Sequence, residues 1–569
     1  MYKQWSVTAA DTACAVTTAS RFNLTLPVAR LLTGRGLTSE SDIKEFLNPS
    51  LTGMLDPLLL KGVDAAVSRL VIALRNEEPV CIYGDYDVDG ITGTSLLVSF
   101  LRRVGFSCEY FIPNRFDDGY GLNQDSLARI ISDGSTLIMS VDCGITSVDE
   151  AAFCRGTGVD LIILDHHLPK NILPDAAAVV NPLQPDCPYP FKSLSGVGVA
   201  FNLLVALRSR LRSEGVFDQT TEPDLREWLY LVALGTIADV VSLTGQNRIY
   251  VCQGLKQLNS GVGTGIAALK KAAGISGDVS CGQVGFRLAP RLNAAGRMES
   301  AVPGVELLLS SDPQECGRIA AELDAANAER QSVERSIFED AVSQLEKSGR
   351  YPACRSIVLG SPDWHQGVVG IVASRIVERY HRPTLLLAFD EEGNGKGSGR
   401  SIPGFHLLDA VSECSGYLTR FGGHRYAAGI GLPRERFADF TAAFETAAVR
   451  QLGSVNPVPV LTVDTEVLAE ELTIELVNDL KRLEPFGAGN PEPTLLLRRV
   501  TAVDRRVVGG SHLKLKLAVG AFRFDAIAFR QSDLATEGVL DVAFFPELNV
   551  WNGRTSLQLR IKDIRQAEE

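Results

Sequence analysis

The stretch VCIYGDYDVDGITGTS, residues 80–95, decides the fold of the first half of the chain. It begins with a short apolar run typical of a buried strand and continues through a glycine-rich turn into a helix. Similar apolar runs follow at 108–112, 136–141 and 160–165, and amphipathic stretches such as 94–105 separate them. Strands that alternate with helices predict an α/β domain with a mostly parallel sheet, which binds its ligands at the carboxyl ends of the strands.

Three aspartates, Asp85, Asp87 and Asp89, stand at alternate positions just after the first of these strands. An ordinary turn uses one aspartate, and one could also cap the helix that starts near Ile91. Three carboxylates at this spacing repel one another unless cations compensate them. A phosphate-binding P-loop is excluded, because no Gly-Lys-Thr or Gly-Lys-Ser follows and acidic groups repel phosphate. We therefore interpret the three aspartates as part of a metal site.

The next strands bring further metal-binding groups to the same edge of the sheet. Asp142 follows the third strand, and the sequence Asp-His-His, residues 165–167, follows the fourth. The segment 227–243 indicates an apolar helix with one acid, Asp239, near its end, and a buried helix tolerates such an acid only if it is paired or coordinated. We predict that one catalytic crevice collects seven residues: Asp85, Asp87, Asp89, Asp142, His166, His167 and Asp239.

The chemistry of these side chains narrows the metal and the reaction. Oxygen-rich ligation with one or two imidazoles and no thiolate favours Mn²⁺ or Mg²⁺, and Zn²⁺ is less suited. Carboxylates that bridge two ions about 3.5–4 Å apart are the usual arrangement for hydrolysis of phosphate esters. We therefore expect two ions, which activate a water for attack on phosphorus and neutralise the charge on the leaving oxygens.

The motifs GDYDVDGITGTS, SVDCGI and LDHH resemble the first three signatures of the DHH phosphoesterase family, named for its Asp-His-His. Within this family the chain is similar to the bacterial RecJ branch, over motifs that extend from about residue 80 to 493. The resemblance implies an exonuclease that hydrolyses single-stranded DNA in the 5′→3′ direction and releases mononucleotides in DNA repair and recombination. It also implies direct metal ligation by Asp87, Asp89, Asp142, His166 and Asp239, with Asp85 and His167 as ligands or as groups behind them.

Two further regions carry residues suited to hold a DNA strand. The RecJ-like segment 287–300 offers two guanidinium groups and an amide for bidentate phosphate contacts, although a structured loop with surface arginines is an alternative. A second α/β pattern, with motifs at 363–375, 395–410 and 421–429, resembles the DHH-associated domain. A phosphate could also meet backbone N–H groups where its helix starts near Gly367. The predicted substrate-binding residues here are Arg291, Asn293, Arg297, Trp364, His365, Ser398, Arg400 and His424.

The C-terminal region predicts a small oligonucleotide-binding β-barrel. The segments 511–519 and 521–529 alternate apolar and polar residues, and 482–493 resembles the RecJ sequence that leads into such a barrel. Eight Arg and Lys against two Asp give residues 495–530 a charge of +6, although the whole chain carries −12. A basic groove with stacked aromatic rings holds single strands in barrels of this kind.

Particular side chains of the barrel are candidates for DNA contacts. Lys514 and Lys516 share one face of a strand, and we predict that both bind the substrate. Three phenylalanines, Phe522, Phe524 and Phe529, are either stacking residues or, as phenylalanines are more often, part of the core.

Pattern changes divide the chain into five parts. The acidic stretch from Pro313 to Ser348 suits one amphipathic helix, long enough to bridge two domains. The predicted parts are an N-terminal helical segment (1–60), a DHH phosphoesterase domain (61–308), a connecting helix (309–349), a DHH-associated domain (350–455) and an oligonucleotide-binding fold domain (456–569).

Composition limits the possible locations and partners. No apolar run approaches the roughly 20 residues that cross a bilayer, and the N-terminus lacks a basic region followed by an apolar run. The 11 cysteines are scattered singly, which fits a reducing cytoplasm. The net charge of −12 argues only weakly against nucleic acid, because local patches decide binding. The resemblance implies a monomer that acts on single-stranded DNA, with a single-strand-binding protein and a repair helicase as partners.

Two other classes of function remain open on the sequence. The same metal core could serve a small-substrate phosphoesterase for short oligonucleotides or cyclic dinucleotides, although the chain length and the basic barrel disfavour it. A non-catalytic DNA-binding relative would have lost metal ligands, and every expected ligand position is filled here.

Overall fold

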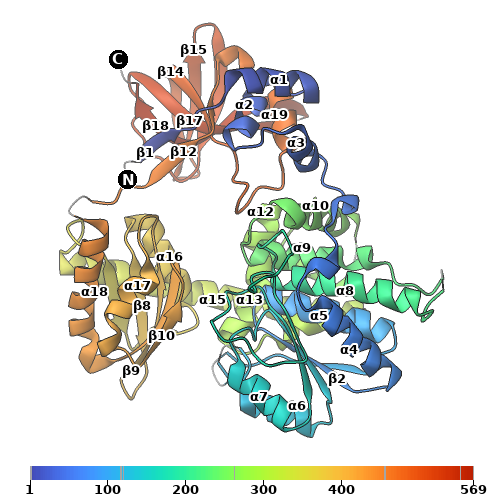
Figure 1. The fold of residues 1–569 in the computed structure, drawn as a ribbon. Coiled ribbons are helices and arrows are strands. Elements are labelled where there is room, and N and C mark those ends of the chain that lie inside the picture. The colour runs from blue at the N-terminus through green and yellow to red at the C-terminus, as the bar shows by residue number, and fades with distance from the viewer. Residues whose placement is uncertain are drawn as a thin grey trace.

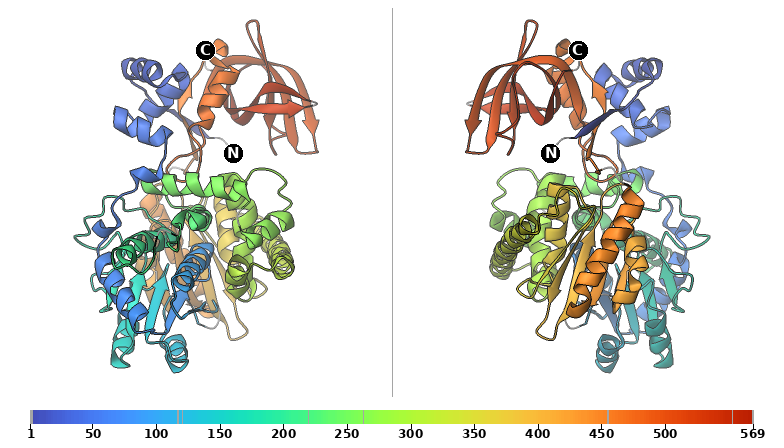
Figure 2. Two further views of the ribbon diagram at one scale, coloured as in Figure 1. Left: turned by 90° about the vertical axis from the view of Figure 1, so that its right-hand side faces the viewer. Right: turned by 90° about the vertical axis from the view of Figure 1, so that its left-hand side faces the viewer.

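The computed structural model describes residues 3–115, 118–119, 121–218, 220–261, 263–453, 456–551 and 553–567. Two α/β domains lie side by side, joined by the long helix α15 (Pro313–Ser348), and a β-barrel with the N-terminal helices lies above them (Figures 1 and 2). No helix in the described part of the chain is long and apolar enough to cross a membrane.

The first domain is built on the predicted parallel sheet. Its strand order is β3-β2-β4-β5-β6, and all four pairings are parallel. The sequence predicts four of these strands and misses β6. The bounds are β2 (Val80–Gly84), β3 (Cys108–Phe111), β4 (Leu137–Val141), β5 (Asp160–Leu164) and β6 (Ala178–Val180). Because β2 lies between β3 and β4, the carboxyl ends of β2 and β4 meet at the topological switch point where such sheets bind ligands.

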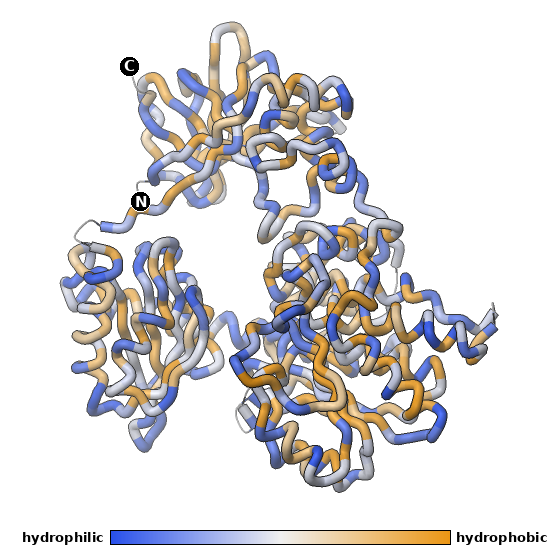
Figure 3. The backbone as a smooth tube through the Cα atoms, viewed as in Figure 1, coloured by the Kyte–Doolittle hydropathy of each residue, from blue (hydrophilic) through white to orange (hydrophobic). Residues whose placement is uncertain are grey.

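Helices cover both faces of this sheet. The helices α4, α5, α8 and α9 share the largest apolar core, and α6 and α7 pack on the opposite face. Figure 3 shows hydrophobic residues concentrated along the central strands. The bounds are α4 (Val63–Arg75), α5 (Val88–Arg103), α6 (Gln124–Ser132), α7 (Val148–Gly156), α8 (Gly196–Ser213) and α9 (Leu229–Ala238).

A helical layer leads from the first domain to the second. It comprises η3 (Leu225–Trp228), α10 (Gly245–Ser260), α11 (Thr264–Ala272), α12 (Cys281–Gln283), η4 (Val284–Leu288), α13 (Ala289–Met298) and α14 (Val302–Leu309). The helix α15 then buries Ile319 and Leu323 in the first core, and Ile337 and Leu345 in a core of the second domain. One helix thus spans the two domains, as its sequence pattern predicts.

The second domain has a mixed sheet of order β10-β11-β9-β8-β7, in which only β7 and β8 are parallel. The helix α16 packs on one face, and α17 and α18 pack on the other. The bounds are β7 (Ile357–Ser361), α16 (Val369–Tyr380), β8 (Thr384–Phe389), β9 (Asn394–Arg400), α17 (Leu407–Glu413), η5 (Ser415–Tyr417), β10 (Arg420–Gly423), β11 (Ala427–Pro433), η6 (Arg434–Arg436) and α18 (Phe437–Leu452).

The predicted C-terminal barrel is closed by five strands, because β14 pairs with both β15 and β17. Its bounds are β13 (Thr465–Glu466), η7 (Ala469–Glu471), α19 (Ile474–Lys481), β14 (Leu495–Val508), β15 (His512–Val519), β16 (Phe522–Ala528), β17 (Val539–Trp551) and β18 (Arg554–Gln566). A closed barrel leaves no open sheet edge among these strands.

The N-terminal helices pack on the barrel, which the sequence does not predict. The helices α2 and α3 place Leu31 and Ile43 in the barrel core, and β1 pairs in parallel with β12 beside the barrel. We call the barrel together with residues 3–47 the barrel module. Its remaining elements are β1 (Gln4–Val7), α1 (Thr12–Phe22), α2 (Leu26–Gly34), α3 (Glu40–Leu47) and β12 (Val460–Val463), and η1 (Leu51–Gly53) and η2 (Pro57–Leu59) then lead to the first domain.

The shared core predicts that an N-terminal substitution destabilises the barrel. Leu31→Ala should cost about 2–5 kcal/mol, since Leu31 is buried among barrel residues. Val16→Ala on α1 is the control, because Val16 is 53% exposed. The measurement is amide hydrogen exchange of β14–β18. Equal protection in Leu31→Ala and the unmodified protein would contradict a shared core.

Candidate metal centre

The acidic side chains come together at the switch point of the parallel sheet. Asp85 directly follows β2, and Asp142 follows β4. Asp87 is the N-cap of α5, where its carboxylate accepts hydrogen bonds from the N–H groups of Asp89 (2.9 Å) and Gly90 (3.1 Å). The turn thus uses one aspartate as an ordinary cap, and the same turn aims the other carboxylates into the crevice.

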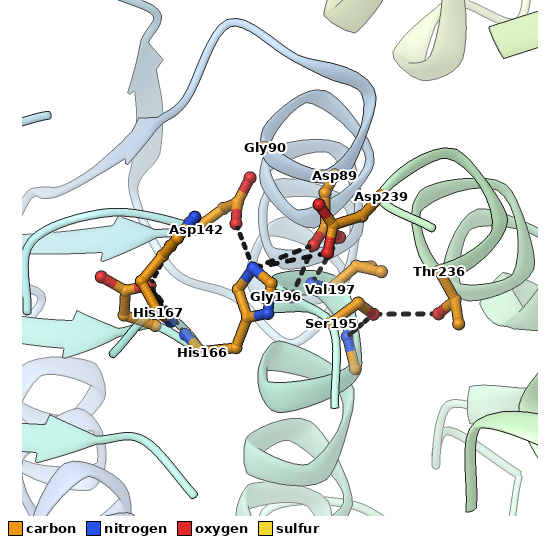
Figure 4. Close-up of polar contacts among 12 residues, drawn as sticks. Asp89, Gly90, Asp142, His166, His167, Ser195, Gly196, Val197, Thr236 and Asp239 are labelled. Atoms are coloured by element: carbon orange, nitrogen blue, oxygen red, sulfur yellow. Dashed lines mark hydrogen bonds and ion pairs between the residues drawn. The ribbon is translucent and has the colours of Figure 1, made fainter. Parts of the chain in front are cut away.

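His166 lies at the centre of the cluster. Its Nε2 atom is 3.1 Å from Asp142 Oδ1, 3.5 Å from Asp239 Oδ2 and 3.9 Å from Asp89 Oδ2 (Figure 4). The predicted apolar helix ends at Ala238, so that Asp239 caps α9 with its side chain directed toward His166. The side chains form three groups, and within each group the possible ligand atoms lie within 4.8 Å of one another. The groups are Asp85, Asp87 and Asp142; Asp89, His166 and Asp239; and Asp142, His166 and His167.

The cluster has the donor set and the unmet contacts of a metal site. Among the described residues, four of its buried atoms have no hydrogen-bond partner: Asp85 Oδ1, Asp142 Oδ1, His166 Nε2 and Asp239 Oδ2. A buried acceptor without a partner is unfavourable, and a divalent cation satisfies several such atoms at once. Carboxylate oxygens with an imidazole nitrogen are ligands that suit Mn²⁺. These residues therefore fit the predicted ions.

Electrostatics show how strongly the cluster needs positive charge. Burial, and then the charges of Asp89 and Asp87, raise the pKa of Asp239 to about 9. Burial and Asp87 raise the pKa of Asp89 to about 7, and the pKa values of Asp85 and Asp142 lie well above their usual range for the same kind of reason. Burial lowers the pKa of His166 to about 4, which keeps its imidazole neutral and able to bind a metal.

The first residue of the Asp-His-His sequence, Asp165, organises the loop. Its Oδ1 accepts from the N–H groups of His166 (2.7 Å) and His167 (3.0 Å) and lies 2.7 Å from His167 Nδ1, while Oδ2 accepts from the Ile145 N–H (2.9 Å). Burial opposes ionisation of Asp165, but the hydrogen bond and charge of His167 outweigh it, so its pKa is lowered. Burial acts against protonation of His167, but Asp165 outweighs it and raises the pKa of His167 to about 9.

A helix N-terminus that the sequence interpretation misses holds Asp89. The N–H groups of Gly196 and Val197, in the first turn of α8, donate to its two oxygens at 2.6 and 2.9 Å. A Cβ on Gly196 would lie 2.8 Å from Asp142 Cβ, so only glycine fits between the two aspartates. The signal in the sequence is Ser195, a helix cap followed by glycine before an apolar run.

Three guanidinium groups lie beside the carboxylates. Arg297 donates to the Gly367 carbonyl at 3.3 Å, just before α16, and Arg400 donates to Ser398 Oγ at 3.0 Å. Burial, and then Arg115, lower the pKa of Arg297 to about 10, and the same two causes lower the pKa of Arg400. Arg115 lies over the ring of Tyr86, 5.1 Å from its centre.

Arg115 was not among the predicted residues. The signal for it is a cation in the loop after β3, at the same edge of the sheet as the aspartates. None of Arg115, Arg297 and Arg400 forms an ion pair with a carboxylate in the part of the chain that the structure describes. Three cations that form no ion pair among the described residues suit a phosphate group.

Three predicted substrate-binding residues make contacts within the protein. Arg291 pairs with Asp324 of α15 at 2.8 Å. The Asn293 side chain accepts from the Val88 N–H at 3.0 Å and so fixes the start of α5. Trp364 is 6% exposed, donates its indole N–H to Asp340 at 2.8 Å and lines the same cavity as His365. A role for these three side chains toward DNA stays a prediction.

The two predicted histidines of the second domain also make local hydrogen bonds. His365 Nδ1 accepts from the Gly367 N–H at 3.2 Å, and His424 Nδ1 accepts from the Tyr426 N–H at 3.3 Å. His365 lines a cavity of about 450 Å³ that Met298 and Lys396 also line. A role for either histidine toward DNA stays a prediction.

The barrel supports one part of the predicted surface and corrects another. Lys516 is exposed and Lys514 partly exposed, on one face of β15. Phe522 and Phe529 are 44% and 47% exposed, but Phe524 is 6% exposed and belongs to the barrel core. Of the two alternatives, Phe524 therefore takes the core role, because the alternation along β16 turns it inward.

The parallel sheet with acidic residues and histidines at its carboxyl edge defines a metallophosphoesterase of the DHH type. Residues 79–236 match the family model "DHH family, N-terminal domain", and residues 353–450 and 463–563 match the "DHHA1 domain" and "RecJ OB domain".

The relatives specify the branch. The single-stranded-DNA-specific exonuclease RecJ of Dickeya dadantii is 40% identical, over 94% of this chain and 95% of that protein. The crystal structure of Thermus thermophilus RecJ with Mn²⁺ matches with a TM-score of 0.86 and 34% identity, over 100% of this chain and 80% of that one. The structure of the same protein with Mg²⁺ matches with a TM-score of 0.80 and 32% identity, over 100% and 79%. The chain belongs to the RecJ family.

The raised pKa values predict that metal binding stabilises the protein more at higher pH. An unfolded aspartate titrates near 3.9, so between that pH and about 9 the folded metal-free protein keeps a proton on Asp239 that the unfolded chain has lost. The free energy of unfolding of the metal-free protein therefore falls as pH rises through this range. Bound Mn²⁺ replaces the proton and so removes this loss of stability. The gain in melting temperature on adding Mn²⁺ should be larger at pH 8 than at pH 6. Asp239→Asn is the control with a smaller difference, and an equal gain at both pH values would contradict the assignment.

Proposed function

We propose that this chain is a metal-dependent exonuclease that hydrolyses single-stranded DNA from the 5′ end and releases mononucleotides. The observation that carries the proposal is the position of the guanidinium cluster beside the carboxylate cluster. The guanidinium cluster suits a terminal phosphate group that must be bound, and the carboxylate cluster suits ions that act on the neighbouring phosphate of the strand. The RecJ relative is named for the same class of reaction.

We further propose that the crevice takes two Mn²⁺ or Mg²⁺ ions. Asp85, Asp87 and Asp142 would hold one, and Asp89, His166 and Asp239 the other, since the ligand atoms within each set lie within 4.8 Å of one another. When bound, such ions polarise the phosphate and lower the pKa of a water. The neutral His166 and the two N–H groups on Asp89 keep the ligands oriented, which is the part the protein supplies.

The guanidinium cluster accounts for attack from an end. A terminal phosphate carries more charge than an internal one, and Arg115, Arg297 and Arg400 form no ion pair among the described residues. Ser398, which accepts a hydrogen bond from Arg400, adds a hydroxyl to the same place. A 5′-phosphate held there would set the distance to the scissile bond, so that one nucleotide is released at a time.

The barrel would hold the part of the strand that has not yet been degraded. The charge of +6 on residues 495–530 and the exposed side chains of Lys516, Phe522 and Phe529 support this role. By resemblance to the family we also propose a cytoplasmic monomer in DNA repair and recombination, with a single-strand-binding protein and a repair helicase as partners.

End-labelled oligonucleotides test the reaction and its direction. We expect a single strand with a 5′-phosphate to lose labelled mononucleotide from that end in Mn²⁺ or Mg²⁺, and to stay intact with excess chelator. A duplex should resist. Release from the 3′ end would overturn the polarity, and hydrolysis that weakens as the strand lengthens would favour a small-substrate phosphoesterase.

Two substitutions separate the chemistry from the grip on the strand. Asp239→Asn removes the charge of a metal ligand without removing a structural hydrogen bond. It should raise the activation barrier by several kcal/mol and so lower the single-turnover rate about a hundredfold or more. DNA affinity should persist, because a negative charge beside phosphate is lost. Asp89→Ala is less suitable, since it also leaves the Gly196 and Val197 N–H groups without their acceptors.

Arg400→Met should show the opposite pattern. Removing a charge-assisted contact of about 1.5–3 kcal/mol should raise KM for a 5′-phosphorylated strand more than for a 5′-hydroxyl strand. The rate and the equilibrium affinity are measured on the same labelled strand. If Asp239→Asn keeps its rate at saturation while Arg400→Met has no effect, the site assignment is wrong.

A further inference from the structure

A buried cation joins the first domain to the barrel module. Arg248 on α10 is 2% exposed, and its Nε donates to the Phe46 carbonyl at 2.9 Å. Nη1 donates to the Leu483 carbonyl at 3.0 Å and Nη2 to the Glu484 carbonyl at 2.8 Å. The Phe46 ring lies 3.9 Å from the guanidinium carbon. Every partner of Arg248 named here comes from the barrel module or from the loop 482–493 that leads into it.

The positions of the acceptors explain why arginine is needed. Phe46 lies in the last turn of α3, and Leu483 and Glu484 follow the end of α19. Carbonyl groups at a helix C-terminus lack partners within the helix and carry the negative end of its dipole. Arg248 satisfies one such carbonyl, that of Phe46, and at the same time donates to two carbonyls of the loop that follows α19. The planar guanidinium has donors spread widely enough to reach both segments.

A second contact lies next to the first. The Leu243 N–H donates to the Ala488 carbonyl at 2.7 Å. Gly489, with φ +71°, lies so close to the first domain that a Cβ would be 2.0 Å from Ser242 Oγ. Asn490 fixes this loop from within, since its side chain donates to the Leu483 and Pro485 carbonyls at 2.8 and 2.9 Å. Figure 1 shows this loop extending from the barrel toward α10 and α12.

We propose that Arg248 is a positioning residue that fixes the barrel module relative to the metal crevice, so that a strand held by the barrel reaches the crevice in a defined register. The inference rests on the proposed exonuclease function. A strand that reaches both sites gains from their fixed separation through a high effective concentration. A strand too short to reach the barrel gains nothing, so the effect of Arg248 depends on strand length.

The test compares Arg248→Met with the unmodified protein on single strands of increasing length. For a strand that spans both sites we expect KM to rise about tenfold or more, because the second contact is no longer held in place. For a trinucleotide we expect kcat/KM to stay within roughly twofold, as for distant, independent sites. An equal loss at both lengths would show that Arg248 only stabilises the first domain, and no loss at either length would also overturn the proposal.

A second variant approaches the same contact from the loop. Gly489→Ala brings a Cβ within 3.0 Å of Ser242 Cβ and 3.3 Å of Ser242 Cα, so the loop shifts relative to Ser242 even if its hydroxyl rotates away, and the variant should reproduce the length-dependent rise in KM. Gly553→Ala is the matched control, because Gly553 has a similar φ of +74° but nothing within 4 Å of the added Cβ. If the two alanine variants behave alike, backbone strain and not the contact is responsible, and the proposal fails.

A measurement without DNA separates this inference from the proposed function. In small-angle X-ray scattering, Arg248→Met and Gly489→Ala should have a larger radius of gyration than the unmodified protein and Gly553→Ala. Unchanged dimensions would overturn the positioning role whatever the activity. If the unmodified protein shortens no single-stranded DNA, the proposed function fails, and the scattering result still decides whether Arg248 fixes the barrel.

Discussion

The repulsion among buried carboxylates is the constraint on which the first domain depends. Asp85, Asp89 and Asp142 are nearly inaccessible to water, and each has a raised pKa because burial and its neighbours oppose its charge. Such a cluster destabilises a folded protein unless protons or cations neutralise it. The fold supplies part of the compensation through the N–H groups at the start of α8. The remaining unpaired atoms are what a divalent metal completes.

The sequence predicts those parts of the site that depend on local pattern. Acidic residues directly after apolar strands must meet at one edge of a parallel sheet, so Asp85 and Asp142 could be placed together without coordinates. The position of Asp239 followed from the cost of an acid on an apolar helix. The four predicted strands of the first sheet and the two predicted strands of the barrel, at 511–519 and 521–529, are present in the structure. They could be predicted because apolar runs and alternating patterns are local signals.

The sequence does not show contacts between segments that lie far apart along the chain. Arg291 and Trp364 have the right chemistry for DNA, but their partners on α15, Asp324 and Asp340, could be identified only once that helix was in place. The packing of α2 against the barrel was missed because its apolar face is compatible with any core. Arg115 was missed because its only signal is its place in the loop after β3, at the edge of the sheet that carries the aspartates, although its neighbours Arg297 and Arg400 were predicted.

The carboxylate crevice is proposed to bind two divalent ions. Crystals grown with Mn²⁺ and measured with X-rays at the manganese absorption edge test it directly. The account predicts two anomalous peaks, one among Asp85, Asp87 and Asp142 and one among Asp89, His166 and Asp239. The absence of any peak in this crevice, with manganese bound elsewhere or not at all, would contradict it.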